Sequence, residues 1–346
     1  MGKLLTAAVP AYNAGWCLDK CLSSFVTDPV SSSIEVIVVN DGSTDGTREI
    51  ALGYAGRHPG IFRLIDKENG GHGSVINAAV KQAAGKYFNV VDADDWILTD
   101  NLPRFLETLS RTEADVLLTH YHTVDANSGK RREFKTGGIP LNEAYTLDEF
   151  TAHRGNIYPC VNLHGLTYRT GLYRNSGTIL SEGIFYEDQE YATLPFVNVQ
   201  TILPLDLFLN QYRIGSASQS VSDRSIVKRL SHVEQVVRRL FRCYIESGGA
   251  SEGAKRYIAW KAADMLHYYY VAALVKNPDK PGGRKEAARV REEMRGLAPS
   301  IVEKMDFRYR LSAAMNRLKF SGRAVEFMKR PFLYDMYWKL FRQNRG

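Results

Sequence analysis

Short apolar runs alternate with amphipathic stretches along the first third of the chain. The apolar runs are Leu4–Pro10, Glu35–Asn40, Phe62–Asp66 and Tyr87–Asp92. Helical stretches lie between and after them, at roughly Ala14–Phe25, Thr44–Tyr54, Ser74–Ala84 and Asp100–Ser110. Short apolar strands that alternate with helices predict an α/β fold, in which a mostly parallel central sheet is flanked by helices. Ligands of such sheets bind beyond the carboxyl ends of the strands, so we expect the informative residues to follow the strands.

The rest of the chain is less regular until its last third. Ala114–His120 has the composition of one more strand. In His232–Glu246 the apolar residues recur every three or four positions, as on one face of a helix. Further helices are expected at Ala254–Val275 and Arg284–Leu297, separated by a breaker rich in proline and glycine at residues 277–283. The pattern therefore predicts a C-terminal α-helical extension.

Charge divides the chain into an acidic front and a basic back. Residues 226–346 hold 26 Lys and Arg against 12 Asp and Glu, a net charge of +14, whereas residues 1–225 have a net charge of −7. A basic surface can meet anionic lipid, nucleic acid or an anionic glycan, but no nucleic-acid recognition motif accompanies this charge. The apolar run at Leu4–Val9 is too short for a signal peptide, and no apolar stretch approaches the ~20 residues of a membrane span. We therefore expect a cytoplasmic protein, in solution or peripheral to the inner face of the plasma membrane.

Polar residues follow the first two predicted strands. Pro10 has no N–H group, so a strand is not expected to continue through it, and the backbone should turn and present Tyr12 to a ligand. A plain loop explains this stretch equally well. After the second strand, Ser43 or Thr44 can cap the next helix. Capping does not explain Asp41, whose carboxylate can accept the imide N–H of a uracil ring.

A glycine-rich turn follows the third predicted strand. Asn69–Ser74 holds three glycines in four residues, which lets the backbone approach a ligand closely. The helix that follows offers its N-terminus to a diphosphate. The turn is neither a Walker loop nor a dinucleotide fingerprint, because no Lys-Ser/Thr pair follows and the glycine spacing differs. His72 fits a loop residue as well as a ligand.

An acidic run, Asp92-Ala93-Asp94-Asp95, closes the fourth predicted strand. If extended geometry persists, Asp92 and Asp94 point the same way and Asp95 the other way. Carboxylates this close repel one another unless a cation or raised pKa values relieve them. A hard divalent cation, with substrate phosphates completing its coordination, is the usual solution. The alternative is an acidic cap on the helix near Asn101, but Asp100 fills that role better, so we interpret the run as a metal site.

A second acidic run, Glu187-Asp188-Gln189-Glu190, lies far along the chain before a predicted helix. By itself, an acid-rich helix N-terminus explains it. The transfer of a sugar to an alcohol also requires a base that takes the hydroxyl proton. A metal-bound Asp94 cannot serve because its lone pairs are engaged, whereas an acidic site supplied by an acceptor half can.

Taken in order, these segments resemble family 2 glycosyltransferases with the A-type, Rossmann-like nucleotide-sugar fold. The matching pieces are VPAYNA (9–14), VIVVNDGSTDGT (36–47), the NGG turn (69–71), VVDADD (90–95) and YEDQE (186–190). Tyr212 to Ser218 adds the polar stretch that often follows the base segment. One of these motifs alone is unspecific, but five in order with the expected spacing are specific. The resemblance covers about residues 4–220.

For the donor, the resemblance implies a UDP-sugar held by residues of the first half. Pro10, Tyr12 and Asp41 would hold the uracil, and Asn69 and Gly70 would line the nucleotide pocket. Many relatives have an Ala-Arg-Asn triplet in the helix after the glycine turn, where this chain has Val75-Ile76-Asn77. His72 and Lys67 are candidate substitutes for the missing arginine.

For the chemistry, the resemblance implies a metal-dependent inverting transfer. Asp92 would face the ribose and phosphate side and share the metal site with Asp94, which would coordinate Mn²⁺ or Mg²⁺. Asp188 would be the general base, with Glu187 beside it. The enzyme would move a hexose or N-acetylhexosamine to a hydroxyl of a glycan, lipid-linked or protein-linked acceptor. Two alternatives stay open, namely a sugar-phosphate nucleotidyltransferase and a catalytically inactive scaffold of the same fold.

The expected domain organisation follows from this resemblance. Residues 1–110 would form the nucleotide-sugar-binding half, and residues 111–225 the acceptor-binding half, of one catalytic domain. Residues 226–346 would form a basic helical region, either a solvated appendage or the contact surface of a homo-oligomer. Within that region, residues 329–342 combine aromatic and aliphatic residues with flanking cations, which suits a helix on an anionic membrane and hence a lipid-linked acceptor.

Overall fold

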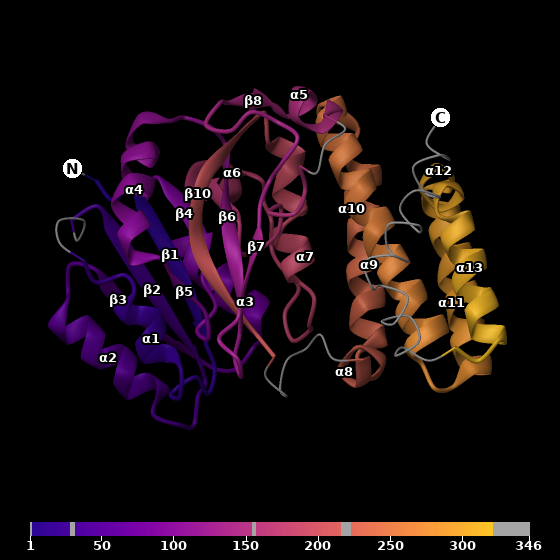
Figure 1. Cartoon of the computed structure of the whole chain (residues 1–346), viewed down its shortest axis with the longest axis horizontal. Coiled ribbons are helices and arrows are strands. Elements are labelled where there is room, and N and C mark those ends of the chain that lie inside the picture. Colours follow the sequence, from indigo (N-terminus) through magenta and orange to yellow (C-terminus); the bar gives the residue numbers. More distant parts are fainter. Residues whose placement is uncertain (1, 28–31, 154–156, 216–222, 321–346) are drawn as a thin grey trace. The chain divides into compact units, whose positions relative to one another are not determined.

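The computed structural model describes residues 2–27, 32–153, 157–215 and 223–320 (Figure 1). The chain divides into two compact units. The first unit comprises residues 1–219 and 246–261, and the second unit comprises residues 220–245 and 262–346. The domain boundaries expected near residues 110 and 225 stay predictions. The segment for which membrane contact is predicted, residues 329–342, lies outside the described residues.

A sheet of ten strands forms the centre of the first unit (Figure 1). Its strands are β1 (Leu5–Ala11), β2 (Ile34–Asp41), β3 (Phe62–Lys67), β4 (Tyr87–Val90), β5 (Trp96–Ile97), β6 (Val116–Asp125), β7 (Arg131–Phe134), β8 (Tyr145–Thr146), β9 (Leu166–Arg169) and β10 (Thr201–Ile214). Their order is β3-β2-β1-β4-β9-β6-β10-β5, with β7 paired to β6 and β8 to β10. Strands β1 to β4 pair in parallel, whereas β9 lies antiparallel between β4 and β6. The predicted α/β class is confirmed, and the sheet becomes mixed beyond β4.

Helices cover both faces of the parallel part of the sheet. The helices of this unit are α1 (Leu18–Ser23), α2 (Thr47–Arg57), α3 (His72–Gln82), α4 (Leu102–Arg111), α5 (Leu147–Ala152), α6 (Thr170–Asn175) and α7 (Asp188–Tyr191). Alternate β1 residues such as Ala7 and Val9 share a buried cluster with Leu18 of α1 and Phe105 of α4. Helix α3 packs on β1 and β2, and side chains alternate between the two faces of a strand. Every residue of β1 and β2 is therefore buried, which explains why these strands read as continuous apolar runs.

The prediction that β1 would end at Pro10 is wrong. β1 continues to Ala11, and Pro10 stands beside Val39 of the parallel strand β2. The carbonyl of Ala8 accepts the Val91 N–H on the side of β4. Residues two apart in a strand direct their backbone groups to the same side, so the N–H that Pro10 lacks would point beyond the end of β4. The proline therefore interrupts no ladder hydrogen bond and is tolerated.

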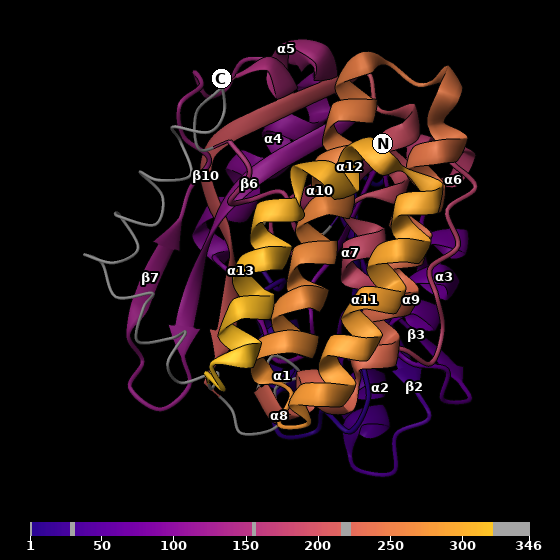
Figure 2. The ribbon, with the colours of Figure 1, turned by 90° about the vertical axis from the view of Figure 1, so that its right-hand side faces the viewer.

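The second unit is helical, as predicted for the C-terminal region (Figure 2). The remaining helices are α8 (Asp223–Lys228), α9 (Leu230–Glu246), α10 (Glu252–Tyr270), α11 (Lys280–Leu297), α12 (Pro299–Lys304) and α13 (Asp306–Arg317), with a π-helical stretch at Val271–Lys276. The end of α9 and the first half of α10 belong to the first unit. Within the described part of the chain, no helix is both long and apolar enough to cross a membrane.

One predicted breaker is shorter than expected. α11 begins at Lys280, four residues before the expected Arg284. The side chain of Asp279 accepts the Gly282 N–H (3.0 Å) and so caps the helix. Pro281 stands in the first turn, where the N–H that it lacks has no intrahelical partner in any case.

Candidate active site

The loops that follow β1 and β2 are tied to each other. Ser43 Oγ accepts the Asn13 N–H (3.0 Å), and Asn13 Oδ1 accepts the Thr44 N–H (2.9 Å). α2 begins only at Thr47, whose N–H donates to Asp45 (3.0 Å). The prediction that Ser43 or Thr44 caps this helix is therefore wrong. Both residues brace the loop after β1.

Of the residues predicted to hold uracil, Tyr12 is the exposed one. Its exposed fraction is 56%, whereas Pro10 and Asp41 are buried. β1 and β2 are adjacent and in register up to Ala11 and Asn40. The structure therefore brings Tyr12 and Asp41 to neighbouring strand ends, with an aromatic ring open to solvent.

Asp41 is the anchor of the glycine turn. Its carboxylate accepts the N–H groups of Gly70 (3.0 Å) and Gly71 (2.9 Å) and lies 2.7 Å from Lys67 Nζ. Asn69 donates its side-chain amide to the Asp41 carbonyl (2.9 Å). The protein itself therefore uses the Gly70 and Gly71 amides. The expectation that the N-terminus of the following helix meets a diphosphate stays a prediction. A carboxylate has about four acceptor positions, of which three are filled here.

His72, the first residue of α3, joins two distant parts of the unit. Its Nε2 lies 2.9 Å from Asp92 Oδ1, and its Nδ1 lies 2.7 Å from Glu187 Oε1. Burial alone would lower the pKa of His72, but the two carboxylates raise it well above its usual value. Each ring nitrogen has a carboxylate oxygen within hydrogen-bond distance. The sequence next to His72 does not predict its contact with Glu187, because the two residues are 115 positions apart.

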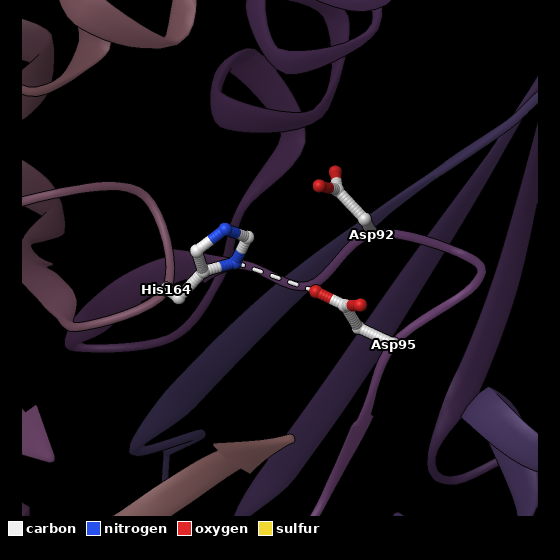
Figure 3. Close-up of side chains that lie close together, drawn as sticks. All are labelled: Asp92, Asp95 and His164. Atoms are coloured by element: carbon white, nitrogen blue, oxygen red, sulfur yellow. Dashed lines mark ion pairs between the residues drawn. The ribbon is translucent and has the colours of Figure 1, made fainter. Parts of the chain in front are cut away.

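The acidic run after β4 is a turn. β4 ends at Val90, and the Asp95 N–H donates to the Asp92 carbonyl (2.9 Å). This turn brings Asp92 and Asp95 to the same side, so the expected opposition of Asp95 to Asp92 and Asp94 is wrong. Ligand atoms of Asp92, Asp95 and His164 lie within 4.8 Å of one another (Figure 3).

These three residues fit a divalent cation. Asp95 Oδ2 is buried, accepts no hydrogen bond from any described residue and lies 3.3 Å from His164 Nδ1. Burial and nearby carboxylates raise the pKa of Asp95 to about 7 and the pKa of Asp94 to about 6. Clustered carboxylates are the ligands that Mn²⁺ or Mg²⁺ prefers, and an imidazole suits a transition metal. Asp94 stands outside this group of three, so its role as a ligand stays a prediction.

Acids of both runs lie near one residue, Tyr212. Burial raises the pKa of Tyr212, and the charges of Asp92, Asp95, Asp188 and Asp94 raise it further. The ring of Tyr212 stacks on His164, with centroids 3.8 Å apart. His164 belongs to none of the predicted motifs, and the sequence carried no signal for it.

The three acids of the second run have different partners. Glu187 is buried and binds His72, and Glu190 is buried and accepts both the N–H and the hydroxyl of Ser181 (2.8 Å each). Asp188 accepts from the amide of Gln189 (2.8 Å). Burial raises the pKa of Asp188, and the charge of Glu187 raises it further. Glu187 and Glu190 therefore bind more distant parts of the chain, whereas the carboxylate of Asp188 accepts a hydrogen bond from the next residue.

Comparison with known proteins points to one family of enzymes. Residues 6–175 match the family model "Glycosyl transferase family 2". The uncharacterized glycosyltransferase EpsJ of Bacillus subtilis is 26% identical over 294 residues, covering 83% of this chain and 82% of EpsJ. Residues 6–175 form a family 2 glycosyltransferase domain. The fold agrees, because the crystal structure of Staphylococcus aureus TarS 1–349 in complex with UDP matches with a TM-score of 0.62 at 19% identity, covering 91% of each chain.

Other relatives of this glycosyltransferase match only in part. Glycosyltransferase GlyA of Streptococcus pneumoniae is 34% identical over 125 residues, which is 36% of this chain and 18% of GlyA. The chain therefore spans under a fifth of that relative. Family membership removes the nucleotidyltransferase alternative, and the roles predicted for single residues stay predictions.

Proposed function

We propose that this glycosyltransferase transfers a hexose or N-acetylhexosamine from a UDP-sugar to an acceptor hydroxyl, with inversion at the anomeric carbon. The observation that carries the proposal is the meeting of Asp92 and Glu187 at His72, with Asp188 next in the chain. This meeting supports a single site that would hold both the donor and the base. The fold neighbour TarS has been crystallised with UDP and with UDP-GlcNAc, which supports a UDP-sugar donor.

Asp188 would act as the general base. The acceptor oxygen would give its proton to the Asp188 carboxylate while it forms a bond to the anomeric carbon. The bond between that carbon and the UDP oxygen would break, and UDP would leave with the electron pair. Because the pKa of Asp188 is raised, its carboxylate is a better proton acceptor than an ordinary aspartate.

The donor would be held by residues of the first half. Tyr12 and Pro10 would pack against the uracil, Asp41 would accept its imide N–H, and Asn69 and Gly70 would line the pocket. Asp41 has one acceptor position left for this purpose.

The residues that would hold a divalent cation are Asp92, Asp95 and His164, with Asp94 as the ligand predicted from the sequence. A Mn²⁺ or Mg²⁺ ion there would offset charge on the leaving diphosphate. The protein residues would orient the two reactants around it.

The acceptor is proposed to be a glycan, a lipid-linked sugar or a glycoprotein, reached from the cytoplasmic side. The positive charge of residues 226–346 supports a nearby anionic surface, and assembly through the C-terminal helices is an alternative use of that region. Deletion of residues 329–346 should reduce sedimentation with anionic liposomes. If the full-length and truncated proteins sediment equally, the membrane proposal fails.

The decisive experiment incubates the protein with a panel of UDP-sugars, Mn²⁺ and candidate acceptors, and measures UDP release. We expect one donor to be preferred and UDP release to depend on both metal and acceptor. Absence of UDP binding by calorimetry would instead identify an inactive scaffold. Equal release without metal would remove the cation from the proposal.

A further inference from the structure

The glycine turn is pressed against the segment that leads into α7. Gly70 accepts the Gly183 N–H on its carbonyl (2.8 Å). A Cβ atom added to Gly73 would lie 2.2 Å from the Ser181 carbonyl oxygen and 3.1 Å from Glu187 Cγ. Real Cβ atoms do not approach a backbone oxygen this closely, so residue 73 must be glycine because another part of the protein is there. The glycine turn, residues 69–74, therefore serves as a seat for residues 181–190.

One helical turn later, Asn77 continues this seat. Its amide donates to the Leu180 carbonyl (3.0 Å) and to Glu182 (3.1 Å), and its oxygen accepts the Leu180 N–H (2.9 Å). The seated segment contains strain, because Tyr186 has a φ of 73° immediately before Glu187. A left-handed conformation is unfavourable for a residue with a side chain and persists only where the surroundings impose it.

His72 is the part of the seat that reaches the acidic residues. Its two ring nitrogens bind Asp92 after β4 and Glu187 before α7. A hydrogen bond that a ring N–H donates to a carboxylate is charge-assisted and roughly twice as strong as a neutral one. The Glu187 side chain has an exposed fraction of only 5%, so water cannot readily replace this donor. With both nitrogens engaged, the ring has no N–H left for a diphosphate.

We propose that His72 is a positioning residue, which holds the base-bearing segment 181–190 on the donor half so that turnover depends on it and donor affinity does not. The proposal rests on the proposed function, because it takes Asp188 as the base. Glu187 directly precedes Asp188, so the bond from His72 to Glu187 fixes the start of α7 and with it the base. A displacement of about 1 Å at a reacting group can lower a rate ~10²-fold.

The first test is a kinetic comparison of His72→Ala with the wild-type protein. We expect kcat to fall about 10- to 100-fold. The Kd for UDP, measured by calorimetry with Mn²⁺, should stay within about threefold, because both ring nitrogens are bound to carboxylates and neither is left to contact the donor. His58→Asn is the matched control, since His58 is another histidine of the same unit and packs near Tyr54 and Phe62. It should leave kcat unchanged.

Two further variants separate the two bonds of the bridge. His72→Asn places its amide near the position of Nδ1 and can keep the bond to Glu187. His72→Gln reaches the position of Nε2 and can keep only the bond to Asp92. We expect Asn to restore most of the kcat that Ala loses and Gln to resemble Ala, because only Glu187 is next to the base. In a Glu187→Gln background, His72→Ala should add little further loss, since the two residues act as one unit.

Three results would overturn the proposal. One is a kcat for His72→Ala within about twofold of wild type. Another is an unchanged kcat with a Kd for UDP that rises as kcat/KM falls, which would make His72 a donor ligand. The third is restoration by Gln and not by Asn. Asp188→Asn, assayed in parallel, tests the proposed function separately. If Asp188→Asn loses turnover and His72→Ala keeps it, only the inference about His72 is wrong. If Asp188→Asn keeps normal turnover, both the proposed base and the inference are wrong.

Discussion

The proposed donor half (residues 1–110) and the proposed base-bearing segment (residues 181–190) place their carboxylates by different means. Asp41 ends β2 and Asp92 follows β4, so parallel strand pairing brings both to the same edge of the sheet. Glu187 and Asp188 follow no strand, and side-chain and glycine contacts with α3 hold them in place. The first arrangement follows from backbone periodicity and the second from a few specific contacts. Single substitutions should therefore perturb the base-bearing segment with little effect on the donor half.

The largest expected effect tests which region carries the base. Asp188→Asn should lower turnover ~10²-fold or more, because the amide cannot accept the hydroxyl proton, while the Kd for the UDP-sugar stays nearly unchanged. Turnover is measured by UDP release and binding by calorimetry. Asp100→Asn, an exposed acid of the donor half, is the control and should behave like wild type. Equal turnover in both variants would take the base away from residues 181–190.

The contact between the two regions is tested by Gly73→Ala. The added methyl group meets the Ser181 carbonyl, so we expect a loss of unfolding free energy of about 1–3 kcal/mol together with a lower kcat. Gly56→Ala is the matched control, since no atom lies within 4 Å of its added Cβ and alanine favours α2 by up to about 1 kcal/mol. Denaturant unfolding measures both changes. A Gly73→Ala protein as stable as wild type would mean that Gly73 does not pack tightly against the Ser181 carbonyl.

Two substitutions compare the metal ligand predicted from the sequence, Asp94, with the group Asp92, Asp95 and His164 in the structure. His164→Ala should weaken Mn²⁺ binding about tenfold, because an imidazole that holds the metal or its ligands is removed. Asp94→Ala should remove metal-dependent donor binding if the sequence prediction is right. Titration of free Mn²⁺ by electron paramagnetic resonance, in the presence of UDP, measures both. Normal Mn²⁺ binding by His164→Ala, with loss in Asp94→Ala, would favour the sequence prediction over the structural group.

The donor half shows what the sequence could predict. The four parallel strands were placed to within one or two residues, because strands buried on both faces read as unbroken apolar runs. The resemblance also indicated the family and both acidic runs. Details that depend on where a strand stops were missed: β1 passes through Pro10, and the turn after Val90 brings Asp95 to Asp92.

The contacts of the two histidines could not be predicted in this way. His72 was noticed, but its partner Glu187 is 115 residues away, and no spacing rule links the two. His164 lies just before β9, and it reaches Asp95 only because β9 inserts antiparallel between β4 and β6. A sequence shows which residues have suitable chemistry, whereas strand order decides which of them meet.

The smallest expected effect lies in the second unit and sets the baseline for the comparison. Arg289 lies 2.8 Å from Glu234 and 2.7 Å from Glu286, and its side chain is 43% exposed. The pair with Glu286 is exposed, and the buried Glu234 keeps Arg238 as a partner at 2.6 Å. Arg289→Gln should therefore lower the unfolding free energy by less than about 1 kcal/mol, and by still less at high salt. UDP release should match wild type, because the variant changes none of the residues proposed for catalysis. Melting curves at two salt concentrations measure the first effect, and a large fall in turnover would show that the second unit contributes to catalysis.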